Sequence, residues 1–327
     1  MTNLVHPERQ ASFATLRAWL VRLALAGLIA APTFLALVAL SGMQNQYADL
    51  LAQFTAPALF AAVGLGLLLA LVRRWRWAAA AVVPAALLLI AVVPQWFPTA
   101  SRPEAGAASI RLYSANLWVR NRDVEAIAAS IRQADADIVM LIELGDATAP
   151  HLDALVGHYP HRIASPRIDR PNGAVRSVIA SRYPLATLPR PGGVEAVGAR
   201  AVTPIGPINL VSIHLTRPWP FEESWGQISQ TMALGEMLEE LDGPVLVAGD
   251  FNSVSTARIG KQVRRDIGLR PAPGFPGTWP GALPSALGIT IDQVYASPDL
   301  AFVSRRLGRP TGSDHRPVVT EVTRAAD

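Results

Sequence analysis

The first 97 residues of this chain contain three long apolar stretches, which constrain its fold more than any other feature. They cover residues 19–40, about 52–72 and 77–97, and a helix of about 20 such residues crosses a bilayer. A buried core helix would explain one of them, whereas three in succession favour membrane helices. The first stretch is long for the apolar region of a cleaved signal peptide, and two more spans follow it, so we favour retained anchors. We therefore predict an N-terminal membrane anchor over residues 1–97, with three transmembrane helices.

The basic residues of this segment predict its orientation. All six lie at the N-terminus or in the second connection: Arg9, Arg17, Arg22, Arg73, Arg74 and Arg76. The first connection, residues 41–51, has no basic residue and carries Asp49. Because basic loops are retained in the cytoplasm, we expect the N-terminus to lie there. Three spans then carry everything after residue 97 to the outer side of a bacterial plasma (inner) membrane.

The remaining chain has a different pattern. Residues 98–109, rich in Pro, Ala, Gly and Ser, are typical of a linker. Over residues 110–327, many short apolar runs alternate with few helical patterns, which favours two packed sheets, antiparallel or mixed, with helices outside. The predicted helices are residues 123–134 and 222–241. The predicted strands are residues 110–118, 137–142, 177–180, 194–202, 208–213, 245–248, 289–295, 300–307 and 318–322.

Charge and cysteine content exclude some classes of function. The chain has a net charge of +4, and six arginines against two acidic residues place all of it within residues 1–97. The rest is neutral overall, so it lacks the global basic field of a domain that grips nucleic acid. The absence of cysteine excludes disulfides, thiolate nucleophiles and cysteine-based zinc sites. Local basic clusters keep a nuclease open: Arg162, Arg167, Arg170, Arg176, and Arg258, Lys261, Arg264, Arg265, Arg270.

Polar side chains follow several of the predicted strands. Asp250 and Asn252 come directly after the apolar run 245–248, and their spacing places a carboxylate and an amide on the same face. Near the C-terminus, Asp314 and His315 add a carboxylate and an imidazole. Oxygen ligands for a hard cation beside a histidine are what metal-assisted attack on a phosphate ester requires. The pattern therefore favours an enzyme over a binding module.

Four more polar residues lie at the ends of other predicted strands: Asn116, Glu143, His214 and Asp292. Taken singly, Asn116 and Glu143 are equally compatible with turn residues. His214 alone is more typical of a structural histidine, and Asp292 alone of a turn cap. Because strand ends gather in a packed sheet, we expect the whole set to form one site.

The order of these residues resembles the endonuclease/exonuclease/phosphatase superfamily, also called DNase I-like, over about residues 108–325. The resemblance implies a four-layer α/β/β/α sandwich that hydrolyses phosphoesters with Mg²⁺ or Mn²⁺. Residues 110–327 would then be the catalytic domain. The matching segments are Ser-Ala-Asn116-Leu-Trp, Ile-Glu143, Ser-Ile-His214-Leu, Gly-Asp250-Phe-Asn252-Ser, Thr-Ile-Asp292-Gln-Val and Gly-Ser-Asp314-His315-Arg-Pro.

The resemblance also implies roles for the metal-proximal residues. Glu143 would ligate the metal, with Asn116 alongside it and Asp314 at its edge. Asp250 would orient or deprotonate the attacking water. One departure is that isoleucine precedes Glu143 where many relatives carry glutamine.

The remaining residues would act on the phosphate. By the same resemblance, Asn252 positions it, while His214 and His315 stabilise charge on the phosphoryl oxygens. Asp292 would orient His315. The sequence has no clear counterpart of the tyrosine that contacts the phosphate in the family. Arg182 is a candidate for a position near the phosphate.

The substrate stays open among three hypotheses. Three spans ahead of such a domain resemble the VanJ-type glycopeptide-resistance proteins, which implies a polyprenyl pyrophosphate. We therefore expect a membrane-anchored phosphatase acting on a lipid-linked or small phosphate, with an extracytoplasmic active site. Residues 217–221 are compatible with an aromatic loop turned towards lipid, but a packed Pro-aromatic loop is the more typical explanation of such a segment. The alternatives are a tethered endo- or exonuclease that cleaves DNA, and a non-catalytic phosphate-ligand sensor.

Overall fold

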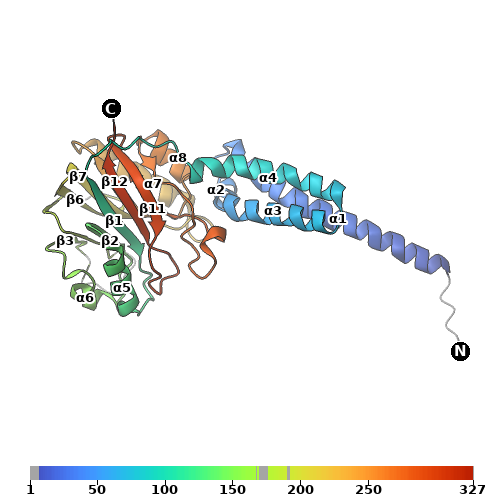
Figure 1. The fold of residues 1–327 in the computed structure, drawn as a ribbon, viewed down its shortest axis with the longest axis horizontal. Helices are drawn as coiled ribbons and strands as arrows, with labels where there is room; N and C mark the ends of the chain where they lie inside the picture. Colours follow the sequence, from blue (N-terminus) through green and yellow to red (C-terminus); the bar gives the residue numbers. More distant parts are fainter. Residues whose placement is uncertain (1–6, 167, 169–175, 190–191, 327) are drawn as a thin grey trace.

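A bundle of apolar helices projects from one end of a two-sheet sandwich (Figure 1). This computed structural model describes residues 7–166, 168, 176–189 and 192–326. Arg167 and Arg170 of the first basic cluster lie outside the described residues. The chain runs from the N-terminus through the helices into the sandwich, where it ends.

The bundle is built from α1 (Pro7–Ser41), α3 (Thr55–Leu71) and α4 (Trp75–Trp96). Two helices are long and apolar enough to cross a membrane, over Thr15–Ser41 and Trp75–Trp96. By length and composition there are up to three candidate spans, if α3 and the short helix before it, which are bent by 57° relative to each other, count as one. Small and aliphatic side chains pack where the helices meet: Ala36, Ala56, Leu59, Ala62, Leu88 and Val92.

The first predicted connection is wrong in part, because residues 41–51 are not all loop. They contain most of α2 (Gln46–Gln53), and the following helix begins at Thr55 rather than near residue 52. The Asn45 side chain accepts hydrogen bonds from the amides of Tyr47 and Ala48, which caps α2 at its N-terminus. One face of α2 is buried through Ala48, Ala52 and Gln53.

The predicted linker is held against the sandwich. Pro103 forms an isolated β-bridge with Ala325. The Ser101 hydroxyl accepts from Arg270 Nη1 at 2.6 Å and donates to the carbonyl of Pro298 at 2.8 Å. The segment between the bundle and the first strand is therefore held against the sandwich by a β-bridge and by two hydrogen bonds of the Ser101 hydroxyl.

The first sheet has the strand order β11-β12-β1-β2-β4-β3. Its strands β1 and β2 are parallel, and the other neighbours are antiparallel. The bounds are β1 (Ser109–Asn116), β2 (Ile138–Ile142), β3 (His161–Ala164), β4 (Val178–Ser181), β11 (Leu300–Leu307) and β12 (Val318–Arg324).

The second sheet has the order β5-β6-β7-β8-β10-β9, in which β7 and β8 form the parallel pair. The bounds are β5 (Leu185–Thr187), β6 (Glu195–Thr203), β7 (Gly206–His214), β8 (Val245–Asp250), β9 (Arg270–Pro271) and β10 (Asp292–Ala296).

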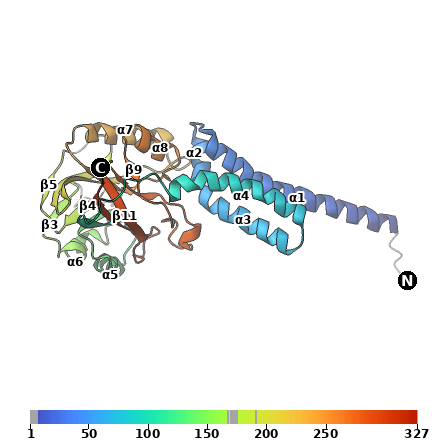
Figure 2. The same cartoon turned by 45° about the horizontal axis from the view of Figure 1, so that its top comes forward.

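Helices cover the outer face of each sheet (Figure 2). The first sheet is covered by α5 (Val124–Ala134) and α6 (Leu152–Val156), and the second by α7 (Ser224–Glu239) and α8 (Arg258–Arg265). Short 3-10 turns are η1 (Ala149–His151) and η3 (Ser285–Leu287). Aliphatic side chains fill the space between the sheets, among them Leu112, Met140, Leu210, Leu246 and Val294. The predicted α/β/β/α layering of the sandwich is confirmed.

Each sheet contains one β-α-β crossover, and these crossovers place the polar residues. Helix α5 joins the parallel strands β1 and β2, and α7 joins β7 and β8. Parallel neighbours end at the same edge, so Asn116 pairs in register with Ile142, and His214 with Asp250. Strand β10 runs antiparallel and starts at that edge, with Asp292 opposite Asp250.

Candidate active site

The strand ends of the two sheets converge on Asp250. Two groups of side chains have ligand atoms that all lie within 4.8 Å of one another. One is Glu143, His214 and Asp250, and the other is Asp250, Asp292 and His315. Residues that are up to 172 positions apart in the chain thus meet in one cluster.

Glu143 lies where β2 ends, between a histidine and an amide. Its Oε1 is 3.3 Å from His214 Nε2 and accepts from Asn116 Nδ2 at 2.9 Å. The same Asn116 Nδ2 donates to Asp250 Oδ2 at 3.1 Å, while its Oδ1 accepts from the Trp118 amide at 2.9 Å. Asn116 therefore bridges the two carboxylates through its nitrogen.

Asp250 is fixed by the turn that follows β8. Its Oδ1 accepts from the Asn252 amide at 2.7 Å, and Asn252 Nδ2 donates to the Leu215 carbonyl at 2.9 Å. Gly249 before it has φ +147°, and a β-carbon there would lie 1.9 Å from the Ile213 carbonyl oxygen. Only glycine fits between the parallel strands at this point.

His315 contacts the Asp292 carboxylate through its ring. Its Nδ1 lies 2.9 Å from Asp292 Oδ2, and its Nε2 lies 3.8 Å from Asp250 Oδ2. Thr278, which the sequence analysis missed, holds the start of β10, because its hydroxyl accepts from the amides of Ile291 and Asp292 at 3.2 Å each. The imidazole thus presents Nε2 to the centre of the cluster.

Asp314 and Arg182 occupy different places. The Asp314 side chain is 44% exposed, with Oδ1 4.0 Å from His315 Nε2, and stands at the rim of the cluster. Its Oδ2 accepts from Trp279 Nε1 at 3.4 Å. Arg182 instead pairs with Asp135 and Asp137, at the start of β2. Since Glu143 follows the other end of that strand, the suggestion that Arg182 serves the site is wrong.

Backbone strain gathers at the cluster. Of the five described non-glycine residues with positive φ, three are Trp118 (61°), Glu143 (55°) and Asn252 (47°). Residues held in this region cost free energy that the surrounding contacts must offset. The strand-end turns are therefore shaped to aim these side chains rather than to minimise local energy.

The electrostatics of the cluster favour a cation. Burial raises the pKa of Asp250, and the Asp292 carboxylate adds to this, although His315 opposes it. Burial lowers the pKa of His315, but Asp292 and Asp250 outweigh it and raise that pKa above its ordinary value. Asp314 Oδ1 is buried and has no hydrogen-bond partner among the described residues. Several carboxylates facing two imidazoles, with one orphaned oxygen, fit a divalent cation.

The edge of the sandwich that carries the cluster also contacts the helix bundle. In the loop after Asn252, the amide of Val254 donates to Gln53 Oε1 of α2 at 2.8 Å. In the loop after His214, the ring of Trp219 lies 4.9 Å from that of Tyr47. Gln53 was not identified by the sequence analysis, because nothing in its local pattern links it to a segment 201 residues away.

A third contact comes from the loop before β10. The rings of Trp96 and Phe275 lie 4.9 Å apart, and the Gly274 amide donates to the Gln95 carbonyl at 2.9 Å. Apolar side chains from both parts complete the interface: Ala52, Val254, Ala257, Ile289 and Ile291.

Known structures share the sandwich. An endonuclease/exonuclease/phosphatase from Beutenbergia cavernae DSM 12333 is similar at 22% identity and TM-score 0.52, over 67% of this chain and 72% of that one. A functionally unknown conserved protein from Enterococcus faecalis V583 is similar at 16% identity and TM-score 0.54, over 66% of this chain and 100% of that one. An endonuclease/exonuclease/phosphatase from Bacteroides vulgatus is similar at 16% identity and TM-score 0.53, over 66% of this chain and 99% of that one.

The family comparison covers the same region. No curated protein matches the chain. The Endonuclease/Exonuclease/phosphatase family matches residues 113–315, which are more than half of the chain and include all of the clustered side chains. Members of this family generally hydrolyse phosphoester bonds. The chain therefore belongs to the endonuclease/exonuclease/phosphatase family.

Proposed function

We propose that this protein is a membrane-anchored, metal-dependent phosphoester hydrolase acting on a lipid-linked or small phosphate. Its active site would lie on the outer side of the bacterial plasma membrane. The observation that carries the proposal is the placement of the cluster at the edge of the sandwich that packs on the apolar helices. In a protein anchored by these helices, a site in that position would lie within reach of phosphates held at the membrane surface.

The donor set indicates which residues would hold the cation. Glu143 would be its main ligand, with Asp314 at the edge, where Oδ1 has no hydrogen-bond partner among the described residues. Asn116 was predicted as a further ligand, but its nitrogen faces the carboxylates, so it supports them. Bound Mg²⁺ or Mn²⁺ would supply positive charge to the phosphate oxygens.

The chain's own side chains account for the remaining chemistry. Asp250 is anchored through both carboxylate oxygens, so it is positioned to align a water molecule and accept its proton. His315 has a raised pKa and presents Nε2 beside Asp250, where an imidazolium offsets charge on a phosphoryl oxygen. His214 lies on the Glu143 side of Asp250 and would contact another oxygen.

Aromatic side chains near the site support a lipid-linked substrate. Phe221 and Trp225 follow the loop that contacts α2, and are 69% and 64% exposed. Together with Trp219 and Gln46 they line a shallow hollow beside the bundle. Exposed aromatic rings at the end of membrane helices are typical of contact with lipid. This arrangement agrees with the resemblance to VanJ-type proteins and their polyprenyl pyrophosphate.

The full-length protein in detergent should release phosphate from polyprenyl pyrophosphate when Mg²⁺ or Mn²⁺ is present. Asp250→Ala and His315→Ala should abolish release, while Asp299→Ala, which removes an exposed carboxylate elsewhere, should retain it. Phosphomonoesters, phosphodiesters and plasmid DNA are assayed beside the lipid. Asp250-dependent nicking of DNA without lipid hydrolysis would replace the proposal with a nuclease, and no Asp250-dependent turnover would favour a sensor.

The orientation is tested separately, and the absence of cysteine makes this simple. Asp299→Cys places a thiol on the sandwich, and Arg74→Cys places one in the connection between α3 and α4. A membrane-impermeant maleimide is added to cells whose outer envelope is permeabilised and whose plasma membrane is intact. It should label Asp299→Cys and leave Arg74→Cys unlabelled. The reverse pattern would contradict the extracytoplasmic site.

A further inference from the structure

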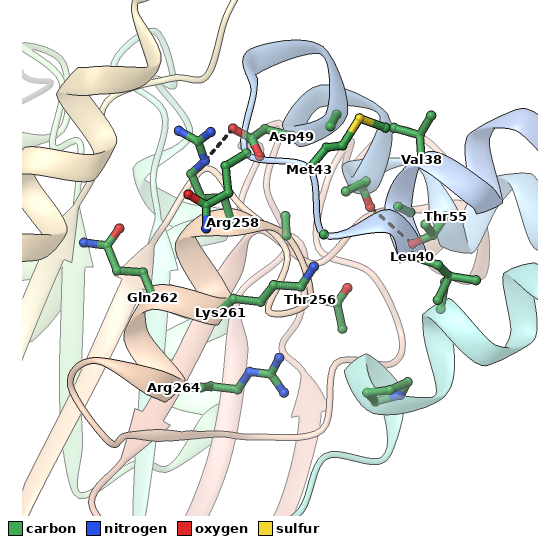
Figure 3. Close-up of a pocket in the computed structure, with 18 of the residues that line it drawn as sticks. Val38, Leu40, Met43, Asp49, Thr55, Thr256, Arg258, Lys261, Gln262 and Arg264 are labelled. Carbon is green, nitrogen blue, oxygen red and sulfur yellow. Dashed lines mark hydrogen bonds and ion pairs between the residues drawn. The ribbon is translucent and has the colours of Figure 1, made fainter.

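A second cavity lies between the helix bundle and the sandwich, away from the clustered side chains. It has a volume of about 570 Å³, and none of the predicted site residues lines it. Helix α8 forms one wall, and the ends of α1 and α4 form the other (Figure 3). The α1 and α4 wall is apolar, with Val38, Leu40, Ile90 and Pro94 among its residues.

The α8 wall is basic. Arg258, Lys261, Arg264 and Arg265 line the cavity, while Asp49 and Asp266 are its only acidic lining residues, all of them within the described part of the chain. This leaves an excess of two positive charges beside an apolar wall. In Figure 3 the side chains of Lys261 and Arg264 extend from α8 into the gap towards the bundle.

One carboxylate is shared between two of these cations. Arg258 Nε lies 3.1 Å from Asp49 Oδ2, and Asp49 also interacts with Lys261. Arg264 Nε is buried and has no hydrogen-bond partner among the described residues. Partial burial lowers the pKa of Lys261, and the neighbouring Arg265 and Arg264 lower it further, although Asp49 opposes this. An ammonium held against other cations in a half-buried site is stabilised by a bound anion.

The level of the cavity along the bundle points to the source of that anion. It lies where α1 ends and α2 begins, next to the end of α4, and the aromatic residues Tyr47, Trp96 and Phe97 fall at the same level. Such aromatic residues mark the interface of a bilayer, which is also the level of lipid phosphates.

We propose that this cavity binds one anionic phospholipid, with its phosphate on Lys261 and Arg264 and its acyl chains along α1 and α4. A free phosphate would leave the apolar wall exposed, and a zwitterionic lipid such as phosphatidylcholine would bring a further cation to a wall that already has an excess of positive charge. The proposal uses the membrane placement proposed above but does not depend on the hydrolase activity. The lipid would fasten α8 to the bundle and so hold the sandwich against the membrane surface.

The test uses the full-length protein in nanodiscs of phosphatidylcholine with or without phosphatidylglycerol. Bound lipid is counted by native mass spectrometry, and the thermal unfolding midpoint is measured in parallel. The variant is Lys261→Gln/Arg264→Gln, and its matched control is Arg122→Gln/Arg132→Gln, which removes the same charge at exposed positions beside and on α5.

Wild type and control should retain one phosphatidylglycerol and gain thermal stability from it. The variant should bind it about 30-fold more weakly, as expected for two interfacial basic side chains. Equal retention of phosphatidylglycerol by the variant and the control would refute binding at Lys261 and Arg264. Stabilisation by glycerol phosphate alone would refute a lipid as the occupant. Equal stabilisation by phosphatidylcholine and phosphatidylglycerol would refute the requirement for an anionic lipid. Failure of the protein to enter nanodiscs would instead remove the membrane placement on which the site rests.

Discussion

Gln53→Ala tests whether the helix bundle takes part in the active site. Gln53 belongs to α2, is 5% exposed, and contacts the two residues that follow Asn252. Its Oε1 accepts from the buried amide of Val254 at 2.8 Å, whereas its Nε2 reaches the Ser253 hydroxyl only at 3.4 Å. The first contact is therefore the stronger one, and alanine removes it.

The size of the effect follows from the orphaned amide. A buried donor left without its acceptor costs about 1–3 kcal/mol. Val254 has no solvent exposure, so water does not replace the lost carbonyl. If this free energy holds the turn that carries Asp250 and Asn252, its loss shifts the population of that turn by about 5- to 140-fold. We therefore expect kcat to decrease by about 5- to 140-fold, because molecules with the misplaced turn are inactive.

The assay measures kcat and KM on the best substrate of the phosphate panel, with full-length protein and Mg²⁺. Gln53→Glu is the matched control, since its carboxylate still accepts from the Val254 amide and can also accept from the Ser253 hydroxyl. We expect it to retain most of kcat. A Gln53→Ala protein that loses thermal stability but keeps wild-type kcat would refute the reasoning, because the contact would then be structural only.

Three further outcomes are expected. Asp292→Asn should lower kcat at least about 100-fold without loss of folded protein, since His315 loses its charged partner; a circular dichroism melt checks the folding. Gly249→Ala should abolish expression of folded protein because its β-carbon would meet the Ile213 carbonyl, while Gly64→Ala, with open space around it, should be tolerated. Chelation by EDTA should abolish phosphate release, and added Mg²⁺ or Mn²⁺ should restore it; activity that survives exhaustive chelation would contradict the metal requirement.

Much of the sandwich was predictable because its central strands are buried on both faces. The strands β2 and β8 contain continuous apolar runs, and each was predicted to within two residues at either end. The short strand β3 was missed, because its half-exposed residues alternate without a strong apolar run. Helix α8 was missed for a related reason: only Ile259, Gly260 and Val263 are buried, and the rest of the helix is polar.

The candidate site was predictable in its members but not in its contacts. The carboxylates and histidines after apolar runs were identified because strand ends carry a recognisable local pattern. Their distances depend on register and on the left-handed turns at Glu143 and Asn252, for which the sequence offers no glycine as a signal. The orientation of the Asn116 amide depends on two carboxylates from other strands, so no local pattern specifies it.

The contacts between bundle and sandwich bear on how such a site would select its substrate. Three loops at the edge of the site hold α2 and α4, and residues 98–108 are pinned to the last strand. The sandwich is therefore not free to swing on a tether. Since the family and the fold leave the substrate open, selectivity depends on what surrounds the clustered side chains. If the bundle spans a membrane as proposed, these contacts hold the site at the level of the membrane surface, and placement would then favour a phosphate carried by a lipid over a soluble ester.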